Sequence, residues 1–402
     1  MRKRVLLVIP RFPYPLIGGD RIKNHNLIKI LNKHYDLDVV TISYENYFAE
    51  TERFLAENTT SYRIFKYPIW KFYRNTLRAL INFKPLQVNF FYFPEVKRYI
   101  DERAKDVDLI IACWVRTAEY VHDKNLPKIL DMADSYAFNY KNSYKKATSL
   151  FWKMIYLVEL PLLYRYEKKM LQIFDRALLF NKREIAFLNS PKALWIPHGV
   201  NDALLNYETV DLRYSKYISF FGKMDYRSNV EAVLWFVKNV FFHLPEDIKF
   251  QIIGAFPTKE ILNLQKLSSR IEVRGYVDDP YVMLKSSLCN IAPMQIGGGI
   301  QNKILEAMAV GSLVVTSSFS AYPIAKQDDN VFIIADSPIE WINTIVDIYN
   351  NPQKYEQVRR NAREYIKQNF TWEIFEKYYI NVIEEVFAER TKFEKQLEYK
   401  SV

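Results

Sequence analysis

The chain has 402 residues, more than one hydrophobic core usually organises, so two domains are expected. Hydrophobic residues make up 49% and charged residues 25%, as in an ordinary globular protein, and no apolar run approaches the roughly 20 residues that span a bilayer. Lys and Arg number 56 against 46 Asp and Glu, a net charge of +10 that favours an anionic partner: phosphate, nucleic acid or an acidic membrane surface.

The cysteines and the start of the chain indicate a cytoplasmic location. Cys113 and Cys289 are far apart in apolar runs, which predicts buried thiols in a reducing compartment and excludes a disulfide framework. Residues 1–15 are basic and then apolar, but the apolar run is shorter than the core of a signal peptide. We interpret it as the first strand.

Apolar runs of strand length alternate with helical patterns, which is typical of parallel sheets covered by helices. The predicted strands are Val5–Pro10, Leu37–Ser43, Tyr62–Tyr67, Leu109–Trp114, Lys128–Met132, Ala177–Phe180, Leu194–Pro197, Tyr217–Phe221, Phe250–Ile253, Ile271–Val273, Leu288–Ala292, Leu313–Thr316 and Val331–Ile334. They predict two α/β domains, each a Rossmann-like, doubly wound parallel sheet, facing a cleft. The predicted bounds are residues 1–205 and 206–372, with a helical segment at 373–402.

The first predicted strand leads into PYPLIGGDR, a turn with Gly18 and Gly19 ahead of a helix. That helix spaces Ile22, Asn26, Ile30 and Leu31 for packing. Asp20 has two open interpretations, because Asp is a preferred N-cap residue and also suits a ligand-binding turn.

Asp131 and Asp134 end another predicted strand, where they point toward the rim of the expected cleft. Asp134 and Ser135 are candidates for orienting an acceptor or accepting its proton, although paired acids at a strand end also cap helices. The next segment, residues 140–169, interleaves basic residues with large apolar ones. Such a segment lies at a membrane interface in some proteins and is an ordinary packed helix pair in others.

In the second domain, the strand that ends at Gly222 is followed by Lys223 and Arg227. The guanidinium fork and the lysine charge suit a diphosphate, and together they can offset the charge on a leaving nucleotide. Basic residues in a surface loop are also often simply solvated.

The stretch Gly297–Ser317 joins three glycines, a helix expected to begin near Ile300 and end before Gly311, and a short buried strand. Glycines let the backbone approach a ligand, and the first N–H groups of a helix lack partners, so we interpret the turn as phosphate-binding. A tight connection without a ligand is the alternative. Lys303 and Glu306 lie off the apolar face of the helix.

These motifs together resemble the retaining GT-B glycosyltransferases of family four over nearly the full chain. In that family a helix reading LLEAMAAG follows a Gly-rich loop, and Glu306 matches the second of its two motif glutamates. Gly298 occupies the position of the first motif glutamate, so this sequence departs from the family pattern. The exopolysaccharide sugar transferases associated with PEP-CTERM systems depart similarly, reading GIQNKVLEAMA, and they also carry PYP followed by GDR.

The resemblance implies a donor site for a UDP- or GDP-linked sugar, with no metal and no other cofactor. IPHGVN matches the family's IPNGVD with His198 in the Asn place, and Lys303 or Gln301 is expected to replace the missing glutamate. The loop that carries a His in many members reads CWVRTAEY, with Arg116 as its nearest polar group. The candidate donor-binding residues are Gly18, Gly19, His198, Gly222, Lys223, Arg227, Gly297, Gly298, Gly299, Ile300, Gln301, Lys303 and Glu306, and the candidate catalytic residues are Lys223, Arg227, Asp134 and Glu306.

The expected function is a retaining, hexosyltransferase-type enzyme that moves a sugar to a saccharide or lipid-linked acceptor in cell-surface polysaccharide assembly. Its expected location is the cytoplasm, with the cytoplasmic face of the inner membrane as a further partner. One alternative is a GT-B epimerase, which needs acid and base residues around the sugar. A basic nucleic-acid-binding protein is the other, but no binding motif or dominant block of positive charge supports a nucleic-acid partner.

Overall fold

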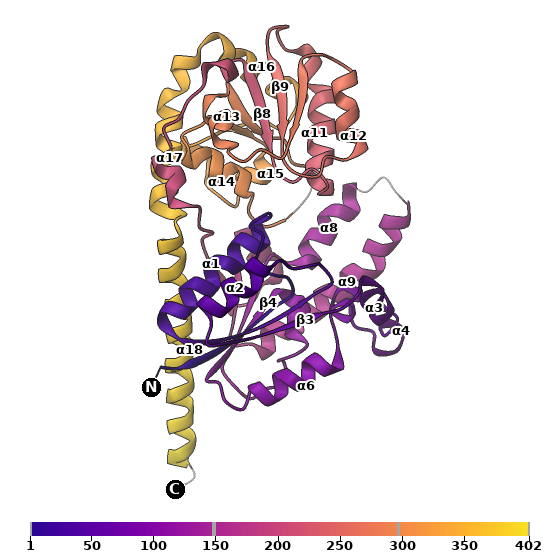
Figure 1. The fold of residues 1–402 in the computed structure, drawn as a ribbon, viewed down its shortest axis with the longest axis vertical. Coiled ribbons are helices and arrows are strands. Elements are labelled where there is room, and N and C mark those ends of the chain that lie inside the picture. Colours follow the sequence, from indigo (N-terminus) through magenta and orange to yellow (C-terminus); the bar gives the residue numbers. More distant parts are fainter. Residues whose placement is uncertain (1, 147–149, 296–297, 401–402) are drawn as a thin grey trace. The chain divides into compact units, whose positions relative to one another are not determined.

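A computed structural model describes residues 2–146, 150–295 and 298–400, which form two units (Figure 1). The first unit runs to Pro197 and resumes at Phe375, and the second is His198–Ile374. The division therefore falls before the predicted boundary at residue 205. The physical reason is local pairing, since the Val200 amide donates to the Phe370 carbonyl at 2.8 Å and ties this segment to the end of the second unit.

In the described residues, the first unit has a seven-stranded parallel sheet in the order β3-β2-β1-β4-β5-β6-β7. Its central strands are apolar and fully buried, as expected of a parallel sheet covered on both faces. The strands are β1 (Arg4–Ile9), β2 (Asp36–Ser43), β3 (Ser61–Lys66), β4 (Leu109–Cys113), β5 (Lys128–Ala133), β6 (Arg176–Leu179) and β7 (Ala193–Trp195).

Helices connect these strands and supply the rest of the first core. They are α1 (Gly19–His34), α2 (Ala49–Asn58), α3 (Ile69–Thr76), α4 (Ala79–Asn82), α5 (Leu86–Phe90), α6 (Pro94–Arg103), α7 (Trp114–Ala118), α8 (Tyr136–Lys146), α9 (Leu150–Ile173) and α10 (Lys182–Leu188). The C-terminal half of α9 packs inward, with Leu163, Tyr166 and Met170 buried. The packed-helix interpretation of residues 140–169 therefore holds for its C-terminal part.

The described part of the second unit has a six-stranded parallel sheet in the order β10-β9-β8-β11-β12-β13. Its strands are β8 (Tyr217–Phe221), β9 (Lys249–Ile253), β10 (Ile271–Gly275), β11 (Cys289–Ala292), β12 (Val314–Thr316) and β13 (Ile333–Ile334). Its α-helices are α11 (Arg227–Asn239), α12 (Lys259–Asn263), α13 (Tyr281–Ser286), α14 (Asn302–Ala309), α15 (Ser318–Ala321), α16 (Pro338–Asn350) and α17 (Glu356–Asn369).

The last helix, α18 (Trp372–Lys400), belongs to the first unit from Phe375 onward. It is fixed there by the Tyr379 hydroxyl, which donates to Asp131 at 3.0 Å, and by Glu384, which accepts from Tyr35 at 2.7 Å. The chain thus returns to its first unit at its end.

Each of the thirteen predicted strands is confirmed, with ends shifted by at most a few residues. Cys113 and Cys289 are free and buried, as predicted. No helix within the described ranges has the length and apolarity required to cross a bilayer.

Candidate functional site

Helix α14 presents Lys303 and Glu306 one turn apart, on neighbouring positions of its surface. The helix begins at Asn302, two residues after the predicted start, and its N-cap residue Gln301 makes no side-chain cap. The first intrahelical bonds are those from Ile304 and Leu305 to the Gln301 carbonyl, so the amides of Asn302 and Lys303 have no partner within the helix. Of the preceding glycines, Gly299 has φ 62°, and Gly297 lies outside the described residues.

The ammonium group of Lys303 is held by neutral acceptors. Its Nζ donates to Asn229 Oδ1 at 2.7 Å and to Gln301 Oε1 at 3.1 Å, and it lies 5.1 Å from the centre of the Phe220 ring. Among the described residues, no carboxylate forms an ion pair with it. Lys303 is thus a half-buried basic group with neutral hydrogen-bond partners and, in the part of the chain that the structure describes, no ion-pair partner.

Burial lowers the pKa of Lys303 to about 7, although nearby Glu306 acts in the opposite direction. A cation in the first turn also opposes the helix dipole. A bound anion removes both penalties, because it supplies the missing negative charge where the free amides of the helix also point.

Glu306 is a second group with a near-neutral pKa. Burial raises its pKa to about 7, while a hydrogen bond from the Tyr281 hydroxyl at 3.2 Å and the charge of Lys303 oppose the shift. Tyr281 is in turn held between ring contacts with Phe221 and Tyr207. Tyr281 therefore positions a carboxylate that is only half-buried and can accept a further hydrogen bond from a ligand hydroxyl.

Gly222 and Asn229 bring the loop after β8 against Lys303. Gly222 has φ 151°, and a Cβ there would lie 2.9 Å from Asn229 Nδ2 and 3.2 Å from Lys303 Cε. A residue other than glycine would be strained at this φ and would also crowd both side chains. Asn229 donates from Nδ2 to the Lys223 carbonyl at 2.8 Å while its Oδ1 accepts from Lys303, so one side chain joins the two predicted segments.

The sequence did not single out Asn229. The available signal was its place on the buried face of α11, where it shares a stripe with Val233 and Phe236. A polar residue on such a stripe needs hydrogen-bond partners, which the Lys223 carbonyl and Lys303 provide.

The structure does not bring Arg227 to Lys303. Its guanidinium is 62% exposed and pairs with Glu231 at 2.8 Å and Glu260 at 3.2 Å. Lys223 is 42% exposed and pairs with Asp225 at 3.1 Å. Both cations are at the surface, and only the Lys223 backbone reaches the Asn229–Lys303 cluster.

His198 is buried, at 3% exposure, with its ring centre 5.1 Å from that of Trp372. The following residue, Gly199, explains the packing, because a Cβ there would lie 2.3 Å from the same indole. The IPHGVN segment thus has a structural role in joining the start of the second unit to its end.

In the first unit, Gly18 is the N-cap residue of α1, with φ 106°, and Gly19 begins the helix. Asp20 accepts from Arg11 Nη1 at 2.8 Å. The N-cap interpretation of Asp20 is therefore wrong, because Gly18 is the N-cap residue and Asp20 lies within the first turn of the helix.

The two predicted acids at the end of β5 have different environments. Asp131 and Lys23 form an ion pair with each side chain only 1% exposed. Burial alone lowers the pKa of Lys23, but the charge of Asp131 raises the pKa overall. Asp131 is therefore a structural residue of the core.

Asp134 is half-buried, and burial raises its pKa to about 7, opposed by Lys23 and reinforced by Asp131 and Asp20. A carboxyl group with such a pKa can exchange a proton near neutrality. Asp134 remains the acceptor-side candidate.

Ser135 and Arg116, the other polar candidates of the first unit, form hydrogen bonds with nearby side chains. The Ser135 hydroxyl donates to Glu167 at 2.6 Å and its amide to Glu184 at 2.7 Å, so Ser135 anchors the start of α8. Arg116 donates to Gln87 Oε1 at 2.8 Å and lies about equally close to the rings of Phe91 and Tyr136, at 5.0 and 4.9 Å.

The sequence is similar to those of known proteins, and one match covers the residues described above. Residues 215–351, which contain Asn229, Lys303 and Glu306, match the family model of the glycosyl transferases group 1. A 44.6 kDa uncharacterized protein in the cps region of Klebsiella pneumoniae is 22% identical over 392 residues, covering 91% of this chain and 96% of its own.

Two solved structures share the fold over both units. Sucrose-phosphate synthase from Thermosynechococcus elongatus has a TM-score of 0.72 at 15% identity, covering 96% of this chain and 100% of its own. HepE of Anabaena in complex with UDP-glucose has a TM-score of 0.65 at 13% identity, covering 95% and 99%. The fold is that of the GT-B glycosyltransferases, as predicted, and the second unit carries the group 1 match.

Proposed function

We propose that the protein is a retaining glycosyltransferase that takes a sugar from a nucleoside diphosphate donor. The observation that carries the proposal is the half-buried amino group of Lys303, which has neutral hydrogen-bond partners, beside Glu306, inside the segment that matches the glycosyl transferases group 1. The complex of HepE with UDP-glucose, which has the same fold, supports a UDP-linked sugar as the donor.

In this proposal, Lys303 and the first amides of α14 bind the diphosphate. As the bond between the anomeric carbon and the diphosphate breaks, negative charge grows on the leaving oxygen, and preorganised donors at that place lower the barrier. Glu306 accepts hydrogen bonds from the ribose hydroxyls. The acceptor hydroxyl forms the new bond and loses its proton to the departing diphosphate, which requires no dedicated carboxylate base.

The first unit supplies Asp134 as the group that orients the acceptor hydroxyl. The relative in the cps region of Klebsiella pneumoniae supports a saccharide or lipid-linked acceptor in cell-surface polysaccharide assembly.

Nucleotide binding is expected to raise the melting temperature. A ligand that binds only the folded state stabilises it by about 2.7 kcal/mol at a hundredfold excess over its Kd. We expect UDP or GDP to give most of the shift and the matching sugar nucleotide to add to it. A thermal melting screen of UDP, GDP, ADP and their sugars measures this, and no shift at millimolar concentration contradicts the donor site.

Glu306→Ala is expected to weaken nucleotide affinity by a factor of about 10 to 100. Loss of a hydrogen bond to a charged group costs about 1.5–3 kcal/mol. Glu306→Gln keeps an acceptor and should have a smaller effect. Calorimetric titration of UDP into wild type and both variants tests this, with Glu260→Ala, an exposed acid of the same unit, as the matched control. Equal affinity for UDP in all four proteins contradicts the role of Glu306.

A further inference from the structure

The helices α3 and α4 in the first unit expose an apolar surface that packing does not explain. Leu80, Ile81 and Phe83 are 78%, 83% and 77% exposed. Trp70, Tyr73 and Leu77 are exposed as well, on the same two helices and their connection. Clustered large apolar side chains in solvent mark an interaction site more often than isolated ones do.

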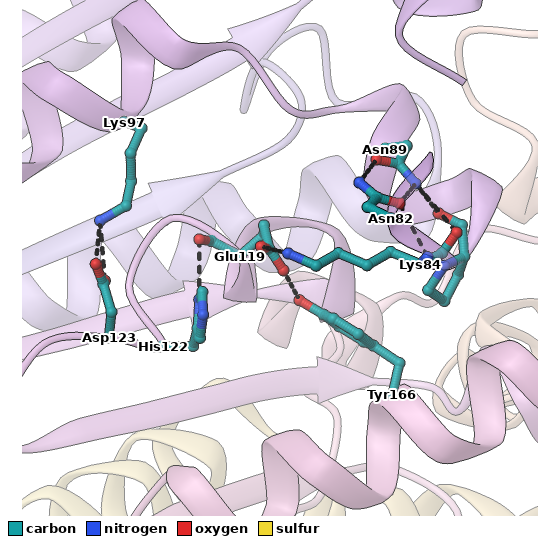
Figure 2. Close-up of polar contacts among 9 residues, drawn as sticks. Asn82, Lys84, Asn89, Lys97, Glu119, His122, Asp123 and Tyr166 are labelled. Atoms are coloured by element: carbon teal, nitrogen blue, oxygen red, sulfur yellow. Dashed lines mark hydrogen bonds and ion pairs between the residues drawn. The ribbon is translucent and has the colours of Figure 1, made fainter. Parts of the chain in front are cut away.

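Buried packing and hydrogen bonds hold α3 and α4 in place. Phe72 is fully buried and packs edge-on against Phe93, with ring centres 4.8 Å apart. Figure 2 shows the polar contacts that follow α4: Asn82 donates to Asn89 at 2.8 Å, and Lys84 pairs with Glu119, which also accepts from Tyr166 at 2.7 Å. The exposed apolar side chains therefore stand on helices whose positions are fixed by contacts with the rest of the first unit.

The backbone conformation of Phe83 also indicates an interaction surface. It has φ 54°, the left-handed region at the end of a helix, where glycine and asparagine are the favoured residues. A phenylalanine there is strained, and with its ring 77% exposed it gains little from packing against the protein. Burial of the ring in a binding partner would explain why phenylalanine occupies position 83.

The first turns of α9 expose a second set of large apolar side chains in the same unit. Glu159 accepts from the Gln87 amide at 3.1 Å, which joins α9 to α5, and the Gln87 side chain donates to the Tyr140 hydroxyl at 3.0 Å. On the N-terminal side of Glu159, the exposed side chains are Leu150, Phe151, Trp152, Met154, Leu157 and Val158. Figure 1 labels α3, α4 and α9 in this first unit.

The charges of these segments have one sign. Residues 69–93, 136–145 and 150–158 contain no Asp or Glu, but they carry Lys71, Arg74, Arg78, Lys84, Lys141, Lys145 and Lys153. Lys71 and Arg74 flank the Trp70 ring at 5.9 and 5.4 Å. Trp with Lys and Arg around an apolar face is typical of proteins that lie in a bilayer interface, where the basic groups meet anionic headgroups.

We propose that α3, α4 and the first turns of α9 form a docking surface for an anionic lipid bilayer. The apolar side chains enter the headgroup region and the basic residues bind lipid phosphates. Pairing of this surface with the same surface of a second copy would place like charges opposite one another, which disfavours a dimer. The proposal is independent of the donor site and goes beyond the proposed function.

The test uses the full chain and vesicles of phosphatidylcholine mixed with phosphatidylglycerol, with phosphatidylcholine alone for comparison. We expect cosedimentation with the anionic vesicles that weakens as salt is added, and little binding to the neutral ones. The triple variant Trp70→Ser, Leu80→Ser, Ile81→Ser should lower the partition coefficient by about tenfold or more. Lys71→Gln and Arg74→Gln should each lower it by about fivefold.

The matched control is a triple variant of exposed apolar residues in the second unit, Leu212→Ser, Leu267→Ser, Ile339→Ser, which should bind as wild type does. Since all six positions are exposed, circular dichroism and melting should be unchanged. Absence of wild-type binding to anionic vesicles overturns the proposal, as does an equal loss in the control. A dimer in sedimentation velocity that only the Trp70, Leu80, Ile81 variant dissociates also overturns it and assigns the surface to a second copy.

Discussion

Lys303→Met is expected to weaken the binding of a sugar nucleotide by about tenfold or more, about 1.4 kcal/mol, and to lower turnover with it. The wild-type ammonium group has no carboxylate partner among the described residues, so an anionic ligand supplies its countercharge. Methionine keeps an unbranched side chain that is one atom shorter, and it removes the charge and the hydrogen-bond donors of Nζ. Lys259→Met, an exposed lysine at the first residue of α12, is the matched control.

The pH dependence of binding gives a second readout of the same variant. In the free protein the pKa of Lys303 is lowered to about 7 by burial, and a bound diphosphate favours the ammonium form and raises it. The contribution of Lys303 to affinity is therefore complete below pH 7 and is lost as pH rises through 7 toward the pKa of the complex. Lys303→Met removes this alkaline fall.

Glu306 produces the opposite limb. Its pKa is raised to about 7 in the free protein, mainly by burial, and hydrogen bonds from ligand hydroxyls favour the carboxylate and lower it. Affinity therefore also falls as pH drops below 7, and Glu306→Gln removes this acidic fall. Calorimetry with UDP-glucose from pH 5.5 to 9, a range chosen to span about two units around the pKa values, resolves both limbs. A flat wild-type profile contradicts the assignment of both residues.

The sequence predicted the fold well because its signals are local. Thirteen apolar runs each became a strand, and Gly311, with φ 77°, ends α14 as predicted. Parallel strands buried on both faces give continuous apolar runs that need no knowledge of tertiary contacts. The glycine at 222 was also identified from its position at the end of a strand.

The sequence predicted the site only in part because partners far apart in the chain decide where a side chain goes. Arg227 was expected to bind phosphate, but α12 brings Glu260 within reach of it. Asn229 was overlooked because its role depends on Lys303, which is 74 residues away. Lys23 was overlooked because the packing pattern of α1 gives no reason to bury a lysine until β5 places Asp131 beside it.

That buried pair gives the largest expected effect on stability. Asp131→Asn should lower the free energy of unfolding by about 3–5 kcal/mol, because it leaves the ammonium of Lys23, 1% exposed, without its countercharge. Without Asp131, burial lowers the pKa of Lys23 below its unfolded value of about 10.5. The folded state of the variant then resists protonation of Lys23, so the stability deficit shrinks as pH rises toward 10.5.

Equilibrium urea unfolding followed by circular dichroism measures this deficit. The double variant Lys23→Met, Asp131→Leu should recover most of the lost stability, because an apolar pair of similar volume replaces a buried ion pair at little cost. Asp134→Asn is the matched single change three residues away. Burial already raises the pKa of Asp134 to about 7, so removing its charge should leave the protein as stable or more stable above pH 7. Equal destabilisation by Asp131→Asn and Asp134→Asn would mean that the charge of Lys23 is balanced by the whole acidic cluster and not by Asp131 alone.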